Sequence, residues 1–573
     1  MSKLTINGSM FKRAGAWFGI FKRITFYGGN SLVLASLHGN AVKTPDRGRV
    51  IDIVPMYQGR KIDFEVEMEP AELTVVTRYG NIRFTFADTT KMLIEGDPGL
   101  GLRFSKTMDK HETVHPRRDG AWEGVFKSTT NFIFKGLDGS GIDFDGGRGY
   151  WNYEKMSSDV VAGFTQPNAE GKFTLVLEEF RYGGYVRDEY PTYAEAKASM
   201  QAEWDAFYAN MPAFPGELEE DRFAVQYMLW SLLTGPSGNA KHIQIMMFAG
   251  AMGSQWQMCQ NAVALMQNPE IALSLLLGPF DQMSAEGQLA DIQDDINCEC
   301  QRIKPAVHGW AILQFMRRYQ LLELWPREKV EELYKGCARW SSWVLKYRDE
   351  DGSGLPVVFH GDESGVDDTS LFADHLVLLT PDTASYVTLL YEGTAKLAAL
   401  LGHDDEAAYW DAQSKKLLHT LIEQMWDGEK FVALTPFKHE KVFSSSVAHY
   451  LPAMLGDRLP AEILDKLVDD LNNPETFCSP YGIPTESMQS IFLTKDAFGR
   501  GAILPSVMIF LCTGLWDSHR HADARRFIET YCNAIRKNEF PLLASPIDGH
   551  DIYSGTWPRC AYTILCGLLA EEK

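Results

Sequence analysis

The spacing of apolar residues changes part-way along the chain. Near the start, Ile62, Phe64 and Val66 alternate with acidic residues, which is the pattern of a half-buried strand. Apolar runs on both sides of the turn at 79–81 predict a hairpin. Further short apolar runs are separated by glycine-rich turns. We therefore expect an antiparallel β-sandwich over residues 1–190.

A short connector follows this region. Thr192 and Glu195 form a capping box, so a helix is expected to start there. Prolines and a glycine end it before residue 216, which gives a helical linker over 191–216. From residue 217 to residue 573, apolar residues recur at helical spacing. At roughly 30 residues for each helix and loop, this part predicts about twelve helices.

Composition narrows the functional classes. The chain has 573 residues, a net charge of −21 and a pI of about 5.2, which argues against nucleic acid and strongly anionic partners. The nine cysteines lack the spacing of a zinc site and indicate reduced thiols in the cytoplasm. The most apolar run, 502–516, is too short to span a membrane, and the N-terminus lacks the apolar run of a signal peptide.

A glycine- and acid-rich loop over 347–370 separates two helical stretches and contains Glu363-Ser364-Gly365-Val366-Asp367-Asp368. Loops held by rigid helices often present functional polar groups, although the same composition is typical of a solvated turn or a calcium loop. The motif resembles the E-S-G-x-D-N signature of glycoside hydrolase family 63 and of trehalases. That resemblance implies that Asp367 is the general acid.

Other landmarks of this family follow in the correct order. They are Trp256-Gln257, Lys304 to Ala311, Tyr481 to Thr485, Phe498 to Pro505 and Trp557. The resemblance implies that the sandwich is followed by an (α/α)6 barrel over 217–573. It also implies a set of substrate-binding residues: Trp256, Gln257, Lys304, His308, Trp310, His360, Glu363, Asp368, Arg500 and Trp557. Taken singly, the tryptophans and His308 are more typical of a packed core than of a sugar-binding site.

The second catalytic group departs from the family pattern. Inverting hydrolysis needs an acid and a base about 6.5–9.5 Å apart. Leu542 stands where the family has its catalytic Glu, and a leucine side chain cannot take a proton. Gln257 likewise replaces an Asp of the family. The candidates for the base are Glu486, which we favour slightly, and Glu539, with Asp548 as a weaker alternative.

The sequence therefore predicts an inverting glycosidase that removes a terminal sugar from an oligosaccharide or small glycoside. No metal or cofactor is expected. Two alternatives remain open. An inverting phosphorylase would use phosphate held by Lys304 or Arg500. A sugar-binding protein or an epimerase could use the same fold, and an epimerase would favour paired histidines such as His308 and His360.

Overall fold

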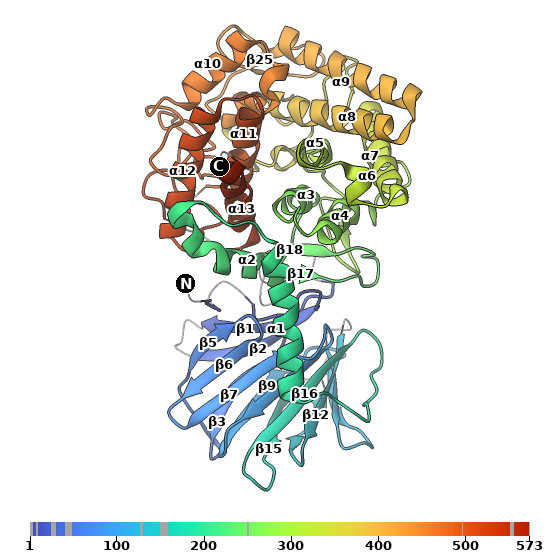
Figure 1. The fold of residues 1–573 in the computed structure, drawn as a ribbon, viewed down its shortest axis with the longest axis vertical. Helices are drawn as coiled ribbons and strands as arrows, with labels where there is room; N and C mark the ends of the chain where they lie inside the picture. Colours follow the sequence, from blue (N-terminus) through green and yellow to red (C-terminus); the bar gives the residue numbers. More distant parts are fainter. Residues whose placement is uncertain are drawn as a thin grey trace, which may run out of the picture.

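The computed structural model describes residues 4–6, 10–24, 30–39, 48–126, 130–148, 159–248, 251–494, 497–550 and 555–571. The chain forms two lobes, with β-sheets in one and helices in the other (Figure 1). The long helix α1 (Tyr193–Asn210) runs along the sheets and leads into the helical lobe. Its expected capping box is confirmed, because the Thr192 side chain accepts from the backbone of Glu195 and the Glu195 side chain from that of Thr192.

The β-lobe contains two antiparallel sheets. The first has the order β1-β2-β3-β9-β15-β13, with β4 paired to β3. Its strands are β1 (Phe18–Ile24), β2 (Asn30–Ser36), β3 (Arg49–Tyr57), β4 (Arg60–Lys61), β9 (Leu100–Thr107), β13 (Gly141–Phe144) and β15 (Val160–Gln166). The second has the order β14-β10-β11-β12-β16-β8-β7-β6-β5. Its strands are β5 (Glu65–Glu69), β6 (Glu72–Thr77), β7 (Gly80–Phe86), β8 (Lys91–Gly96), β10 (Thr113–Pro116), β11 (Trp122–Phe126), β12 (Thr130–Leu137), β14 (Gly147–Arg148) and β16 (Phe173–Phe180).

Aromatic side chains fill the space between the two sheets. Phe18 of the first sheet meets Phe132 of the second with ring centroids 5.4 Å apart. Phe104 and Phe134 meet in the same way at 5.6 Å. Such edge-to-face pairs between two inner faces are typical of a β-sandwich. The antiparallel β-lobe agrees with the sequence prediction, although β5 begins at Glu65, so Ile62 and Phe64 precede the strand.

The helical lobe is a ring of paired helices. Its helices are η1 (Gly216–Asp221), α2 (Arg222–Ser231), α3 (Gln255–Ala264), α4 (Pro269–Leu277), η2 (Gly278–Phe280), α5 (His308–Arg318), α6 (Leu321–Leu324), α7 (Arg327–Tyr347), η3 (Gly361–Ser364), η4 (Ser370–Phe372), α8 (Pro381–Leu401), α9 (Asp404–Met425), η5 (Val447–His449), η6 (Leu451–Arg458), α10 (Ala461–Leu471), α11 (Pro505–Asp517), α12 (His521–Lys537) and α13 (Thr556–Glu571). The short strands are β17 (Leu233–Thr234), β18 (Gln244–Phe248), β19 (Ala251–Met252), β20 (Ile292–Gln293), β21 (Cys298–Glu299), β22 (Val357–Val358), β23 (Leu378–Leu379), β24 (Ala433–Leu434) and β25 (Lys441–Val442).

Six segments close the inner ring by successive contacts. In order around the ring they are α3, α5, α8, η6, α11 and α13, and α13 contacts α3 again. The predicted (α/α)6 barrel is confirmed. An outer helix follows each of the first five in the sequence, so the inner segments run in the same direction. Their N-terminal ends, and the loops that precede them, therefore gather at one end of the barrel.

One inner position departs from regular helix. η6 is a short 3₁₀ segment that kinks at Gly456, where φ is +55°. It lies against Gly514 of α11, where an added Cβ would sit only 2.5 Å from the backbone of Met454. Because glycine removes the side chain at this contact, the two backbones approach each other closely.

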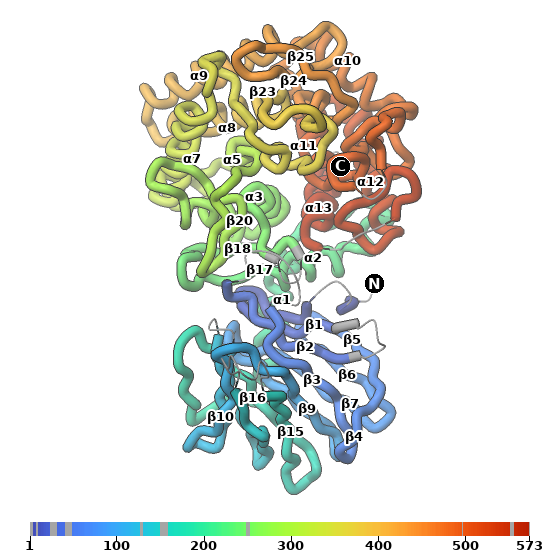
Figure 2. The backbone as a smooth tube through the Cα atoms, turned by 180° about the vertical axis from the view of Figure 1, so that it is seen from behind, coloured from blue at the N-terminus to red at the C-terminus, as the bar shows by residue number. Residues whose placement is uncertain are grey.

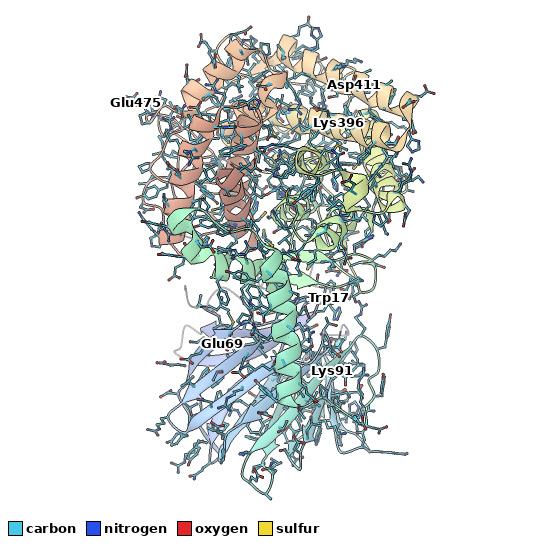
Figure 3. The ribbon with its side chains drawn as sticks, viewed as in Figure 1. Trp17, Glu69, Lys91, Lys396, Asp411 and Glu475 are labelled. Atoms are coloured by element: carbon cyan, nitrogen blue, oxygen red, sulfur yellow. The ribbon has the colours of Figure 1, made fainter. Side chains whose placement is uncertain are left out.

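The N-terminal segment ties the two lobes together. The Gly15 amide donates to Leu233 O at 2.9 Å, and the Gly235 amide donates to Gly15 O at 2.9 Å. The Trp17 indole, labelled at the junction in Figure 3, donates to Gly235 O at 2.8 Å. Seen from behind, β17 and β18 lie on the side of the helical lobe that faces the sheets (Figure 2). Among the described residues, no helix has both the length and the apolarity to cross a membrane.

Candidate active site

The loop that carries Asp367 is shaped by a left-handed glycine. His360 caps η3, because its Nδ1 accepts from the Asp362 amide at 3.2 Å. Gly365 then adopts φ +76°, and an added Cβ would lie 2.5 Å from the Trp256 ring and 3.0 Å from Pro305. The glycine of the motif is thus required both by its backbone conformation and by close packing.

Glu363 anchors this loop from behind. Its two carboxylate oxygens accept from the Arg348 guanidinium at 2.6 and 2.8 Å. It also accepts from the backbone amides of Phe359 at 2.9 Å and Ile303 at 3.3 Å. The carboxylate is buried and accepts from four donors, so Glu363 positions the loop. Its expected role in substrate binding stays a prediction.

Asp367 points to the open side of the loop. Its Oδ1 lies 2.9 Å from Lys304 Nζ, and the Asp367 side chain is 38% exposed. Lys304 is buried, and its ammonium also donates to Asp362 O at 2.6 Å. The expected acid and the expected lysine are therefore brought together, as a charged pair at the N-terminal end of the barrel.

Asp291 is a third ionisable group in this place, and the sequence analysis missed it. It is 6% exposed, and its Oδ1 has no hydrogen-bond partner among the described residues. Burial raises the pKa of Asp291 to about 6, with Lys304 opposing the shift and the charge of Asp367 adding to it. In the sequence it stands near Asp294 and Asp295 with nothing to distinguish it.

Glu486 is joined to the same loop by a serine. Its Oε2 accepts from Ser370 Oγ at 2.7 Å, and its Oε1 accepts from Ser490 Oγ at 2.6 Å. The carboxylate is fully buried. Burial raises its pKa, while the two serine hydroxyls and the nearby cations Arg500 and Lys430 oppose the rise.

Asp368 and Arg500 connect the loop to the segment before α11. Asp368 is exposed, and its Oδ1 accepts from the Gly499 amide. Arg500 Nε donates to Asp368 O at 2.8 Å. An added Cβ at Gly499 would lie 2.6 Å from Thr369 N, so these two segments pack as one unit.

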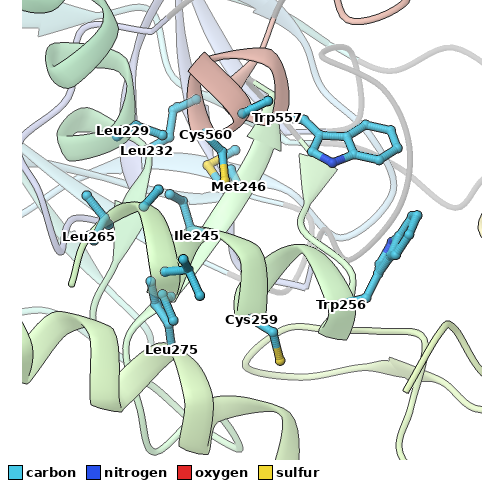
Figure 4. Close-up of a cluster of buried hydrophobic side chains, with 14 of the residues drawn as sticks. Leu229, Leu232, Ile245, Met246, Trp256, Cys259, Leu265, Leu275, Trp557 and Cys560 are labelled. Atoms are coloured by element: carbon cyan, nitrogen blue, oxygen red, sulfur yellow. The ribbon is translucent and has the colours of Figure 1, made fainter. Parts of the chain in front are cut away.

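The three tryptophans form the floor beneath the site. Trp256 and Trp557 meet edge to face at 5.6 Å, and Figure 4 shows both at one end of a cluster of buried apolar side chains. Trp557 Nε1 donates to Gln260 Oε1 at 2.8 Å, and Trp310 Nε1 donates to Thr513 Oγ1 at 3.1 Å. All three are buried. They pack in the core, and the expectation that they bind substrate stays a prediction.

Three other expected ligands also have structural roles. His308 is fully buried and stacks on Phe280 at 4.8 Å, and burial lowers its pKa to about 4. Gln257 completes a capping box with Ser254 at the start of α3. His360 is exposed and caps η3. These positions follow from helix starts at the end of the barrel, where caps are needed.

The segment that should carry the family's base lies beside the start of α11. The Ile503 amide donates to Ala544 O at 2.8 Å, which fixes this segment at the N-terminal end of the barrel. Leu542, which stands where the resemblance implies a catalytic Glu, is buried there. Glu539 is exposed on the turn after α12, with φ +58°. Across the described residues, no cluster of three or more His, Cys, Asp or Glu side chains is arranged to hold a metal.

Comparison with known proteins identifies the barrel. Residues 280–550 match a family model described as "Mannosylglycerate hydrolase MGH1-like glycoside hydrolase domain". These residues are thus similar to a glycoside hydrolase domain over slightly less than half of the chain. The match spans the Asp367 loop, Glu486 and Leu542, and it confirms the resemblance to family 63. The protein is thus a glycosidase. No curated protein matches the sequence.

Solved structures share the architecture at low sequence identity. The chain overlaps "Structure of the gh92 family glycosyl hydrolase ccman5" with a TM-score of 0.56 and 12% identity, over 99% of this chain and 86% of that one. It overlaps an uncharacterized conserved protein from Thermus thermophilus with a TM-score of 0.50 and 16% identity, over 58% and 96%. A GH63 mannosylglycerate hydrolase from the same organism, in complex with glucose, gives a TM-score of 0.48 and 17% identity, over 55% of this chain and 92% of that one. The first of these overlaps includes both lobes, so their combination recurs in a glycosyl hydrolase.

Proposed function

We propose that this protein is an inverting glycosidase that removes a terminal sugar from a small glycoside or oligosaccharide, with Asp367 as general acid. The observation that carries the proposal is the way the motif presents this residue. Gly365 turns the loop, Glu363 locks it to Arg348, and the partly exposed Asp367 carboxyl stands at the open side. A proton donor must reach the glycosidic oxygen, and the anchored loop holds it in place for that step.

We propose Glu486 as the general base. Leu542 has no acid–base chemistry, so the water that attacks the anomeric carbon needs another carboxylate. Glu486 is joined through Ser370 to the loop of Asp367, and its two serine donors fix the orientation of the carboxylate. Its raised pKa makes it a stronger base than an exposed glutamate. Glu539 is exposed on a turn after α12, which supports it less.

The family name gives the first substrate to test. Mannosylglycerate carries a neutral sugar and one carboxylate, and six inner segments begin at the end of the barrel where the proposed site lies. Backbone N–H groups at helix N-termini favour a single anionic group.

The nine cysteines are all free, which supports a reducing compartment, and we place the enzyme in the cytoplasm. We also propose the domain division 1–190, 191–216 and 217–573, since β16 ends at Phe180 and α2 starts at Arg222.

The phosphorylase alternative is less well supported. It needs a cation free to hold phosphate, but Lys304 contacts both Asp367 and Asp362, and Arg500 Nε contacts the backbone of Asp368. The same assay distinguishes the two reactions, because a phosphorylase releases a sugar phosphate and depends on added phosphate.

The test uses purified protein with mannosylglycerate, 4-nitrophenyl α-mannoside and 4-nitrophenyl α-glucoside, with and without phosphate. Proton NMR of fresh product should show free sugar of inverted anomeric configuration. Asp367→Asn and Glu486→Gln should each lower kcat by at least about 10²-fold. Glu462→Gln, an exposed change on α10, is the matched control and should retain full activity.

Three outcomes would overturn parts of this proposal. Full activity of Asp367→Asn removes the acid assignment. If Glu486→Gln stays active while Glu539→Gln is inactive, the base is Glu539. A sugar phosphate as product, formed only with added phosphate, replaces hydrolysis by phosphorolysis.

A further inference from the structure

Cys298 and Cys300 lie in contact with each other on the hairpin of β20 and β21. Their sulfur atoms are 3.2 Å apart. The two strands pair in antiparallel register, with Gln293 opposite Cys298. Side chains two positions apart on an extended segment point to the same side, which places the two thiols together. The pair is thus formed by local backbone geometry.

Exposure separates this pair from the other cysteines. Cys298 and Cys300 are exposed, whereas Cys478 is partly buried and the remaining six are buried. Burial raises the pKa of the Cys259 and Cys512 thiols well above the usual value, which makes such thiols unreactive. A reagent dissolved in water therefore reaches the pair before it reaches the other thiols.

The two cysteines are held differently by the backbone. Cys298 lies in the ladder of β20 and β21, and the Asp291 amide donates to Glu299 O at 2.8 Å, which fixes the strand up to that residue. Cys300 lies beyond the last pair of the ladder, and its carbonyl accepts from the Gln288 side chain at 2.8 Å. A movement that draws the two sulfur atoms together therefore falls mainly on Cys300.

The segment after Cys300 supports the active-site loop. The Ile303 amide donates to Glu363 Oε1 at 3.3 Å, and Lys304 Nζ lies 2.9 Å from Asp367 Oδ1. Three residues separate Cys300 from Lys304. A displacement of Cys300 is therefore passed along a short segment to the lysine that contacts the proposed acid.

We propose that Cys298 and Cys300 are a redox-sensitive modification site, at which a small-molecule disulfide oxidises the two thiols to an intrachain disulfide that lowers turnover. The effect on turnover rests on the proposed role of Asp367. Bond formation brings the sulfur atoms from 3.2 Å to about 2.0 Å, so the segment that leads to Lys304 must shift. Disulfides in the cytosol are usually transient or redox-sensing, and an exposed one is open to reduction by dissolved thiols.

Thiol–disulfide exchange with oxidised glutathione balances every atom and electron. Burial and the contact with Cys298 raise the pKa of Cys300 to about 11, so Cys300 keeps its proton in the resting pair. Cys298 gives its proton to solvent, and its sulfur attacks one sulfur of oxidised glutathione. A mixed disulfide forms, the glutathione S–S bond breaks, and one glutathione thiolate leaves.

The second step closes the intrachain bond. Cys300 gives its proton to the thiolate that has left, and its sulfur attacks the Cys298 sulfur. The bond between Cys298 and glutathione breaks, and the second glutathione thiolate takes a proton from solvent. Two protein thiols are thus oxidised to one disulfide, and one oxidised glutathione is reduced to two thiols.

The first experiment does not depend on activity. Reduced protein is incubated with oxidised glutathione, its free thiols are alkylated with iodoacetamide, and its peptides are measured by mass spectrometry. In the wild type, Cys298 and Cys300 should carry no alkyl group, and their peptide should be lighter by two hydrogen atoms. Excess dithiothreitol should restore both thiols. Cys300→Ser should stop at a glutathione adduct on Cys298, because the second thiol is missing.

Cys478→Ser is the matched control. It removes a cysteine outside the pair, so the disulfide should form as in the wild type. A glutathione adduct that persists on Cys298 in the wild type overturns the proposal. Full alkylation of both thiols after the incubation also overturns it.

The second experiment measures kcat for oxidised and reduced protein with the hydrolysed glycoside. Oxidation of the wild type should lower kcat by about tenfold, because a small displacement of a positioning group is costly, and dithiothreitol should restore it. The double variant Cys298→Ser, Cys300→Ser should have the same kcat after both treatments. An unchanged kcat in wild type whose disulfide is closed overturns the effect on turnover. If the disulfide forms but the reduced protein hydrolyses no glycoside, the proposed function fails and the modification site stands.

Discussion

Arg348 and Glu363 form a buried two-bond ion pair behind the active-site loop. The guanidinium nitrogens lie 2.6 and 2.8 Å from the two carboxylate oxygens, and the side chains are 6% and 3% exposed. Each charge depends on the other, because water cannot reach either. The pair also fixes the loop that ends in Asp367, so its loss should affect both stability and catalysis.

Glu363→Gln should therefore be strongly destabilising. The change keeps the shape of the side chain but leaves the Arg348 charge buried without its partner, which costs about 3–5 kcal/mol. Urea unfolding measures this loss, and kcat should fall with it. Asp411→Asn, which breaks the exposed pair with Lys415, is the control and should change stability by less than about 0.5 kcal/mol. Equal losses for the two variants would show that the buried pair anchors nothing.

Gly365→Ala should displace the Asp367 loop. A left-handed alanine costs about 1 kcal/mol, and here the new Cβ also meets the Trp256 ring at 2.5 Å. Gly402→Ala is a close control. Its φ is +79°, and no described atom lies within 4 Å of the added Cβ, so it incurs the backbone cost alone. Thermal unfolding should show the larger loss for Gly365→Ala, and only that variant should lose activity. Equal losses of thermal stability in the two variants would mean that the Trp256 ring moves away from the new Cβ at little cost.

His308 should make the protein sensitive to acid. Burial lowers its pKa to about 4, whereas an unfolded histidine titrates near 6.5. Between these values the unfolded state binds more protons, so stability falls as the pH is lowered from 6.5 to 4, by up to about 3 kcal/mol. His308→Gln should reduce this slope in urea titrations at several pH values. Part of the slope should remain in this variant, because burial also lowers the pKa of His449, to about 3. The exposed His419→Gln should leave the slope as it is, and an unchanged slope in His308→Gln contradicts the assignment.

Asp295 should couple the two lobes. It is fully buried at the junction, where it contacts His38 Nδ1 at 2.7 Å and also pairs with Arg181. Asp295→Ala leaves both partners without their shared anion, which costs about 3 kcal/mol. Calorimetry should then resolve two transitions in place of one. Asp143→Ala, at an exposed position of β13, is the control and should keep a single transition. A single transition in both variants would show that Asp295 does not couple the unfolding of the two lobes.

Local signals in the sequence were reliable where one segment decides its own structure. The capping box at Thr192 is formed and starts α1 as expected. Asp367 and Lys304, which the resemblance assigned to one site, lie 2.9 Å apart in the structure. These features depend on the local spacing of residues along the chain, or on residues that the family resemblance assigns to one site.

Features decided by distant residues were not readable. The raised pKa of Asp291 depends on its burial and on the charges of Lys304 and Asp367, which lie on other segments. Glu363 was expected to bind substrate because of the family resemblance, and the motif gave no sign of its contact with Arg348. The tryptophans follow the same rule: their burial depends on how α3, α5 and α13 pack, and composition alone cannot decide between a core and a sugar platform.

The contact between the N-terminal segment and the helical lobe has a consequence for folding during synthesis. Trp17 precedes its partner Gly235 by 218 positions. At 5–20 residues per second, a ribosome takes about 10 to 40 s to bridge that distance. The contacts of the segment before β1 therefore cannot form while the β-lobe is being synthesised. They form only after the first residues of the helical lobe have left the ribosome.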